Sequence, residues 1–288
     1  LLKEEELENI IIKFKKEKIH GINVTLPFKK SIIPYVDKLT LEANKSRSVN
    51  TIYKENGKII GHNTDIAGFE LGLRHFKYDV KGKKIFILGS GGVVPSIILA
   101  LRKMKVFEIF LSNRTKKKAE ELKKNFSELQ IVDWGEIPNF DMIINATSIG
   151  LKNEDEIELD YSAIGTNKFF YDIIYNPKET IFLKKAKLFG NRTENGKMMF
   201  IYQAHQAFTI WHKLMPRIDD ETINLLDKWF KVLNMKLKEK ISVITGAASG
   251  FGKGIAKKFS EEGAIAVLAD INSEALKQVA KEFNQDFF

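Results

Sequence analysis

Cysteine is absent from the 288 residues, and proline occurs only six times. Without cysteine, the chain has no disulfide, no thiolate metal ligand and no cysteine nucleophile. Its five histidines are scattered without metal-binding spacing, so we expect no metal site. We find neither a secretory leader in the first residues nor an apolar run of the roughly 18 to 20 residues that cross a bilayer. These absences predict a cytoplasmic protein with no membrane partner.

Arginine is also scarce, although the formal net charge is +9. Only six of the 46 basic residues are arginine, and the lysines stand beside glutamates, as in "KKKAEELKK" at 116–124. Nucleic-acid sites usually gather charge on one face and favour arginine for bidentate contacts. The composition therefore indicates a solvated lysine surface, and we expect no nucleic-acid partner. A polyanion-binding protein stays as an alternative, which salt-sensitive DNA binding would reveal.

The apolar residues are ordered in a pattern that indicates an α/β fold. Residues 83–174 alternate short β-rich runs such as "KKIFILGS" and "VFEIFLSN" with helical stretches such as "VVPSIILALRKM". Such alternation is typical of a Rossmann-like parallel sheet covered on both faces. Before it, we expect a helix at about 3–17 and two strands around the Asn-Gly turn of "VNTIYKENGKIIGHNT". After it, the pattern predicts helices at 195–214 and 219–233.

A glycine-rich turn, "ILGSGGVV", lies between the first of these strands and its helix. Gly89, Gly91 and Gly92 would let the backbone turn tightly and approach a pyrophosphate at the helix N-terminus. The third position of the usual fingerprint is Val94 here instead of glycine or alanine. The turn therefore indicates a dinucleotide, although a lone G-x-G is weak evidence.

The end of the next strand favours NADP over NAD. Chains that bind the ribose of NAD usually place Asp or Glu about 20 residues after the turn. Here "SNRT" supplies Asn113, Arg114 and Thr115 instead. A guanidinium with hydrogen-bonding neighbours suits a 2′-phosphate. The alternative is a surface segment that caps the following helix, and Thr115 could serve both roles.

Two charged residues lie at strand-to-helix junctions upstream. Lys29 follows "NVTLPF", and Asp65 lies in "GHNTDIAG". An ammonium and a carboxylate beside a carbonyl substrate can supply a proton and orient hydroxyl groups. From the residues alone, Lys29 is one lysine among forty, and Asp65 fits a helix N-cap better than a catalytic role.

Eight motifs in order give the chain a resemblance to the shikimate dehydrogenase family over about residues 5–234. They are "GINVTLPFK" (21–29), "SVNTI" (48–52), "GHNTDIAG" (61–68), "GSGGV" (89–93), "SNRT" (112–115), "INATSIG" (144–150), "YDIIYNP" (171–177) and "NGKMMFIYQA" (195–204). The resemblance implies a two-domain oxidoreductase, a monomer or homodimer, that reduces 3-dehydroshikimate to shikimate with NADPH in aromatic amino acid biosynthesis. It implies a substrate domain at 1–79 with 200–234 and an NADP domain at 80–199.

The same resemblance assigns roles residue by residue. It implies that Lys29 and Asp65 are the catalytic pair. The substrate-binding positions that it implies are Thr25, Asn50, Asp65, Tyr175 and Gln203. The NADP-binding positions that it implies are Gly89, Ser90, Gly91, Gly92, Val93, Asn113, Arg114, Thr115, Thr147, Ser148, Ile173, Gly196 and Met199. Alternatives are a quinate or NAD-dependent relative, an NADP-binding homologue without turnover and, for Gln203, a satisfied core amide.

Two features depart from the family pattern. The family's N-terminal strand and Ser-x-Ser-Pro motif are missing, which predicts weaker substrate affinity and an exposed sheet edge. From Met235, "KISVITGAASGFGKGIA" resembles the start of a short-chain dehydrogenase. Asp270 lies 24 residues beyond Gly246, a spacing that favours an NAD-type ribose contact. We expect residues 235–288 to be an incomplete, inactive Rossmann unit that cannot bury its own faces as a whole domain does.

Overall fold

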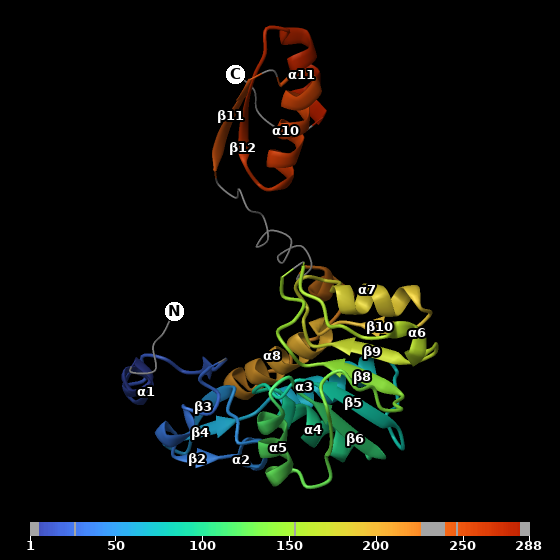
Figure 1. Ribbon diagram of the computed structural model, residues 1–288. Coiled ribbons are helices and arrows are strands. Elements are labelled where there is room, and N and C mark those ends of the chain that lie inside the picture. Colours follow the sequence, from blue (N-terminus) through green and yellow to red (C-terminus); the bar gives the residue numbers. More distant parts are fainter. Residues whose placement is uncertain (1–5, 26, 153, 226–239, 246, 283–288) are drawn as a thin grey trace. The chain divides into compact units, whose positions relative to one another are not determined.

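The protein is described by a computed structural model for residues 6–25, 27–152, 154–225, 240–245 and 247–282. It forms two compact units, Leu1–Pro216 (unit 1) and Arg217–Phe288 (unit 2), each described here by itself (Figure 1). Residues 220–225 of the predicted helix at 219–233 are helical, whereas the rest and the expected boundary at Met235 lie outside the described residues. Within the described ranges, none of the helices has the length and apolar composition of a membrane span.

Unit 1 contains a six-stranded sheet, sheet B, in which every pairing is parallel. Its strands, in the order β10-β9-β8-β5-β6-β7, are β5 (Lys84–Leu88), β6 (Glu108–Ser112), β7 (Gln130–Val132), β8 (Met142–Asn145), β9 (Phe169–Asp172) and β10 (Arg192–Glu194). The predicted parallel sheet is therefore confirmed. The pattern did not indicate β7 and β10, because three-residue edge strands carry too little apolar alternation to be recognised.

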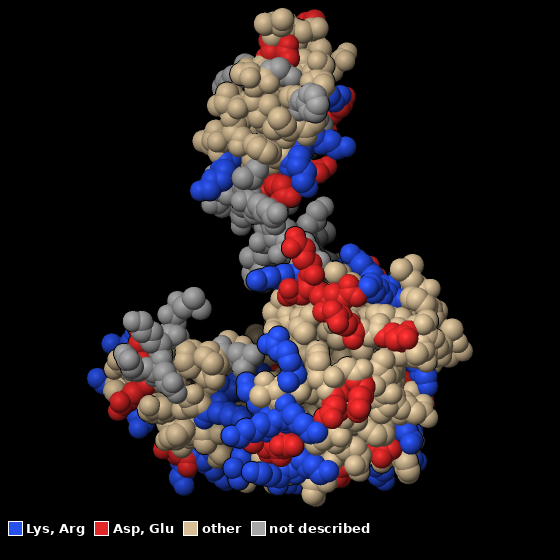
Figure 2. Space-filling model, viewed as in Figure 1, with Lys and Arg blue, Asp and Glu red and all other residues tan. Residues whose placement is uncertain are grey.

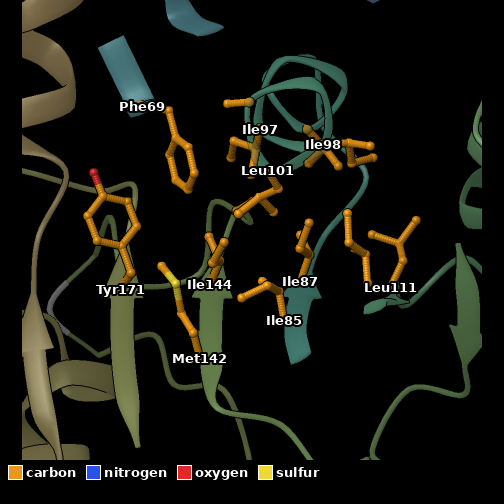
Figure 3. Close-up of a cluster of buried hydrophobic side chains, with 14 of the residues drawn as sticks. Phe69, Ile85, Ile87, Ile97, Ile98, Leu101, Leu111, Met142, Ile144 and Tyr171 are labelled. Carbon is orange, nitrogen blue, oxygen red and sulfur yellow. The ribbon is translucent and has the colours of Figure 1, made fainter. Parts of the chain in front are cut away.

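Helices cover both faces of sheet B. On one face lie α3 (Asp65–His75), α4 (Val94–Lys103) and α5 (Lys116–Asn125), and on the other lie α6 (Tyr161–Ile164) and α7 (Ile181–Leu188). Figure 3 shows the first interface, where Ile97 and Leu101 of α4 lie over Ile85 and Ile144 of the strands. These side chains are fully buried, and burying each contributes about 1.5 to 3 kcal/mol. Packing on both faces makes sheet B a rigid support.

A smaller sheet, sheet A, precedes it in the chain with strand order β1-β3-β4-β2. Its strands are β1 (Ile22–Asn23), β2 (Lys38–Leu39), β3 (Thr51–Glu55) and β4 (Lys58–His62). The predicted hairpin is confirmed, because Asn56 and Gly57 join β3 to β4 with φ of 50° and 77°, as a type I′ turn requires. Around it lie α1 (Leu7–Lys15), the 3-10 helix η2 (Ile33–Tyr35) and α2 (Leu41–Ser46).

The last helix of unit 1, α8 (Lys197–His212), connects the two sheets. It packs closely on α3, because a Cβ atom added at Gly68 would lie 2.9 Å from the carbonyl oxygen of Met199. Its far end reaches sheet A, where Trp211 Nε1 donates a hydrogen bond of 3.0 Å to the carbonyl of Ile52. The ends of sheet A strands are thereby held beside the helices of sheet B.

From Lys240 onward, the described residues of unit 2 form one β-α-β-α arrangement. It comprises β11 (Ile241–Thr245), α10 (Gly250–Glu261), β12 (Ile265–Ala269) and α11 (Ser273–Glu282), with the two strands parallel. One face of this pair packs in a small core with Ile244 and Leu268. On the strands themselves, Ile241, Val243 and Ile265 are 71%, 70% and 55% exposed. Unit 2 thus buries one face, as expected of an incomplete Rossmann unit, and its first fingerprint glycine, Gly246, lies outside the described residues.

Candidate active site and nucleotide edge

The predicted cofactor residues follow the strands of sheet B. Gly89 follows β5, Asn113 follows β6, Thr147 lies two residues beyond β8, Ile173 follows β9 and Gly196 lies two residues beyond β10. Parallel strands place their carboxyl ends at one edge, and open α/β sheets bind ligands there. We call this the nucleotide edge. Tertiary structure therefore gathers residues that lie more than 100 positions apart in the chain.

Glycine is required at position 89 for two reasons. Its φ of +105° lies outside the range that side-chain-bearing residues adopt, and an added Cβ would lie 2.7 Å from the carbonyl oxygen of Ala146. Its N–H donates to the carbonyl of Ser112 at 2.8 Å. After Ser90, Gly91 and Gly92, α4 begins without a side-chain cap on its first N–H groups. An uncapped helix start after a glycine turn suits an anionic phosphate.

The "SNRT" segment leaves its polar groups largely unused. Arg114 is exposed and makes no ion pair among the described residues. Thr115 occupies the N-cap position of α5, yet its side chain makes no capping hydrogen bond. Asn113 Nδ2 donates to the carbonyl of Thr115 at 2.9 Å. The hydroxyl of Thr115 therefore gives no support to the alternative that this segment serves to cap α5.

Behind the nucleotide edge lies a buried network that sequence reasoning missed. The fully buried carboxylate of Asp172 accepts hydrogen bonds from Asn145 Nδ2 (3.1 Å), the Ile174 N–H (3.0 Å) and Thr180 Oγ1 (2.6 Å). Asn145 Oδ1 in turn accepts the N–H of Thr147 at 3.0 Å. Burial raises the pKa of Asp172 to about 6. The sequence does contain a signal for this network, because a polar residue ends each of two otherwise apolar strands, "MIIN" and "FFYD".

The loop after β9 meets the start of α8 at the same edge. A Cβ added at Gly196 would lie 2.0 Å from the carbonyl oxygen of Ile173, so only glycine permits this contact. Met199, one turn into α8, is 6% exposed and belongs to the core between α3 and sheet B. Ser148, by contrast, is exposed. The predicted nicotinamide-side residues therefore combine close backbone packing with one largely buried side chain.

The two predicted catalytic residues form an ion pair. Lys29 Nζ lies 2.6 Å from Asp65 Oδ2, and the two side chains are only 13% and 7% exposed. Asp65 is the first residue of α3, where the helix dipole favours a carboxylate. The N-cap position belongs to Thr64 instead, so the capping alternative for Asp65 is wrong. A second hydrogen bond of 2.9 Å, from Asn50 Nδ2 to Oδ1, holds the carboxylate.

Two predicted substrate residues join this pair. Asn50 is buried, and its Oδ1 accepts the N–H of Thr64 at 2.8 Å. Asn50 Nδ2 also lies 3.5 Å from Gln203 Oε1, a weak contact that crosses from sheet A to α8. Gln203 is half-buried and donates to the carbonyl of Phe200 at 3.0 Å. Lys29, Asn50, Asp65 and Gln203 therefore form one connected group, although they come from four separate segments.

Thr25 and Tyr175, the other two predicted substrate residues, are placed by different contacts. Thr25 is exposed, and its carbonyl accepts the N–H of Phe28 at 2.9 Å in the turn that leads to Lys29. The ring of Tyr175 packs against that of Phe200 in a tilted arrangement, with a centroid distance of 4.6 Å. Burial raises the pKa of the Tyr175 hydroxyl. Tyr175 thus lies beside α8 one turn before Gln203.

Several basic side chains on the surface pair with acidic ones. On the face of unit 1 that Figure 2 shows, lysines and arginines gather in the lower part with a few acidic side chains among them, and other acidic side chains gather above. Several lysines are paired directly, as in Lys103–Glu70 (2.7 Å) and Lys116–Asp133 (2.6 Å). These pairs keep part of the lysine charge beside acidic groups at the surface.

A parallel sheet covered on both faces, with a glycine turn and an arginine at its carboxyl edge, is typical of the α/β proteins that bind dinucleotides. Family models agree. The shikimate dehydrogenase substrate binding domain matches residues 1–52, shikimate / quinate 5-dehydrogenase matches 70–174, and short chain dehydrogenase matches 240–288.

Individual relatives support the same assignment. The shikimate dehydrogenase (NADP(+)) of Pelagibacter ubique is 62% identical over 227 residues, which are 79% of this chain and 86% of the relative. The crystal structure of shikimate dehydrogenase from Aquifex aeolicus is 40% identical, with a TM-score of 0.71 and coverage of 78% and 83%. That from Thermus thermophilus, in complex with NADP(H) and shikimate, is 27% identical, with a TM-score of 0.72 and coverage of 80% and 85%. The chain belongs to the shikimate dehydrogenase family and is an NADP-dependent oxidoreductase, as the motifs predicted.

Proposed function

We propose that this chain catalyses the reversible reduction of 3-dehydroshikimate to shikimate, with Lys29 and Asp65 handling the proton. The observation that carries the proposal is their ion pair of 2.6 Å, largely shielded from water beside Asn50 and Gln203. The relatives named above support this choice of substrate, since they are shikimate dehydrogenases.

The residues at the nucleotide edge fit NADP. When bound, NADP supplies or accepts the hydride. The glycine turn from Gly89 and the uncapped start of α4 would hold the pyrophosphate, and Asn113, Arg114 and Thr115 would hold the 2′-phosphate. The loop and helix residues that would face the nicotinamide half are Thr147, Ser148, Ile173, Gly196 and Met199.

The proton step belongs to Lys29. Reduction builds negative charge on the ketone oxygen, which a nearby ammonium stabilises and then protonates. Asp65 holds Nζ in place at 2.6 Å, and Asn50 fixes the other oxygen of that carboxylate at 2.9 Å. In the reverse direction, the deprotonated Lys29 amine accepts the hydroxyl proton.

The remaining polar side chains suit a small, hydroxyl-rich acid. Thr25, Asn50, Tyr175 and Gln203 offer hydroxyl and amide groups, which can both donate and accept hydrogen bonds. We assign them to the substrate's hydroxyls and carboxylate. Their placement on sheet A, the β9 loop and α8 supports a pocket shared between segments.

The domain division follows from the same proposal. We assign residues 1–79 with 200–234 to the substrate, 80–199 to NADP, and 235–288 to no activity of their own. The separate sheets A and B support the division between substrate and NADP domains, whereas the two compact units divide after Pro216 and group residues 217–234 with unit 2. We further propose that the protein is cytoplasmic, that it is a monomer or a homodimer, and that it has no nucleic-acid partner.

The test follows NADPH formation at 340 nm with shikimate and NADP. We expect turnover in the wild type and a fall in kcat of about 10³-fold in Lys29→Met, because general acid–base catalysis contributes about 10² to 10⁴. Lys30→Met is the matched control, since Lys30 is exposed and adjacent, and it should keep wild-type kcat.

Parallel measurements separate the alternatives. Quinate and NAD replace shikimate and NADP in turn, and a nucleotide titration runs on the same sample. Faster turnover with quinate or NAD would redefine the enzyme's specificity. Binding of NADP without turnover on either acid would overturn the proposed reaction and leave an NADP-binding homologue.

A further inference from the structure

Asn63 is a buried amide whose side chain contacts four residues in three segments of the chain. It lies between β4 and α3 and is 1% exposed. Its Oδ1 accepts the N–H of Asp65 at 3.0 Å. Its Nδ2 lies within hydrogen-bond distance of Ser46 Oγ (3.0 Å), the Ser48 carbonyl (2.9 Å) and Ser96 Oγ (3.0 Å). Ser96 Oγ also lies 3.3 Å from Asn63 Oδ1.

Ser96 belongs to the helix that begins at the nucleotide edge. It is the third residue of α4, is fully buried, and lies one turn beyond the glycine turn. Asp65 begins α3 and forms the ion pair with Lys29. The side chain of Asn63 therefore links the first turn of α4 to the backbone of Asp65.

Only an amide satisfies both sides of this position. The Asp65 N–H requires an acceptor, whereas the Ser46 hydroxyl oxygen and the Ser48 carbonyl are served by a donor. A carboxylate would keep the acceptor but bury a charge against a carbonyl, and an aliphatic side chain would leave several buried polar groups unpaired. The chemistry of the pocket thus selects asparagine.

We propose that Asn63, through Ser96, is a positioning residue that holds Asp65 and Lys29 in fixed register with the nucleotide-binding turn. The proposal rests on the proposed function, since it assigns α4 to NADP and the ion pair to the proton. Hydride and proton must reach the same carbonyl group, and misplacement of a reacting group by about 1 Å can cost about 10²-fold in rate.

The experiment compares Ser96→Ala and Asn63→Ala with wild type in the full chain. Ser96→Ala removes only the link to α4 and leaves the bond from Asn63 to Asp65. We expect kcat at saturating shikimate and NADP to fall by about 10-fold in Ser96→Ala and further in Asn63→Ala, with the Kd for NADP changing by less than about 3-fold.

Asn191→Ala is the matched control for loss of a buried amide. Asn191 is 6% exposed and bonds Gly165 and Lys168 at the opposite, amino edge of sheet B. It should lower Tm as the other variants do while leaving kcat unchanged. If Asn63→Ala does not fold, Ser96→Ala decides alone.

The outcomes distinguish the positioning role of Asn63 from the proposed function. Wild-type kcat in a folded Ser96→Ala would overturn the positioning role and leave the proposed function intact. A fall in kcat of the same size in Asn191→Ala would overturn it too, because the effect would then be general destabilisation. Absence of turnover in the wild type would overturn the proposed function, and the positioning role with it.

Discussion

Units 1 and 2 each place a glycine-rich turn between a strand and a helix, but their surroundings differ. In unit 1, the turn at Gly89 lies in a sheet of six strands with cores on both faces. In unit 2, the corresponding turn is followed by one further strand among the described residues, and that pair leaves Ile241 and Val243 exposed. The local chemistry is similar, whereas the tertiary support is not.

The difference shows what a nucleotide site needs beyond its fingerprint. The turn supplies backbone N–H groups for phosphate, but the remaining contacts come from the ends of neighbouring strands. Unit 1 brings Arg114, Thr147 and Ile173 to its edge through three other strands. Unit 2 brings Asp270, whose carboxylate accepts the Ala248 and Asn272 N–H groups at 2.9 Å each. We therefore expect glycine substitutions in the two units to differ in their effect.

Alanine at one glycine of each unit should show the largest contrast. Gly89→Ala forces a side chain into positive φ and against Ala146, and we expect a loss of about 2 to 4 kcal/mol in the free energy of unfolding. Gly254→Ala, in the interior of α10 with no atom within 4 Å of the added Cβ, should stabilise α10 by up to about 1 kcal/mol. Chemical denaturation measures the first and amide hydrogen exchange of α10 the second. Destabilisation of α10 by the second change would contradict the comparison.

The buried Asp172 should give unit 1 a pH dependence of its own. Its pKa is raised by burial from 3.8 to about 6, so the folded state binds the proton more tightly than the unfolded state. The free energy of unfolding should therefore decrease as pH rises from about 4 to about 6, by about 3 kcal/mol from this group.

Asp172→Asn removes this titration while leaving the other acids in place. The decrease between pH 4 and pH 7, measured by urea unfolding, should be smaller in the variant than in the wild type by that amount. Parallel curves for the two proteins would show that Asp172 does not titrate in this range.

Arg114 should decide the choice of nucleotide. We expect Arg114→Ala to raise the KM for NADP about 30-fold and to change that for NAD by less than about 3-fold, because a charge-assisted phosphate contact is lost. Lys124→Ala removes an exposed positive charge from the far end of α5 and serves as the control. Equal losses for both nucleotides would place Arg114 elsewhere than at the 2′-phosphate.

Removal of residues 235–288 should have the smallest effect. The connected site lies wholly in unit 1, so kcat and the KM for shikimate should change by less than about 2-fold. Steady-state assays of the shortened and full chains make the comparison. A large loss would show that unit 2 contributes to the reaction.

Much of the fold could be predicted because its signals are local. Alternation of apolar runs indicated the strands of sheet B, and Asn56–Gly57 indicated the hairpin, since turn chemistry depends on adjacent residues. Motif order predicted the family and the candidate pair, Lys29 and Asp65. The edge strand β10 escaped notice, because its pairing depends on β9 and not on its own pattern.

The sequence by itself determined the class of fold, the glycine turn, the arginine beside it and the identity of the candidate residues. Tertiary structure alone decided the contacts, because they join segments far apart in the chain. The Lys29–Asp65 pair spans 36 residues and the Asn63–Ser96 contact 33. Such contacts exist only where packed helices and parallel strands bury the intervening surfaces, and no local propensity encodes which surfaces will meet.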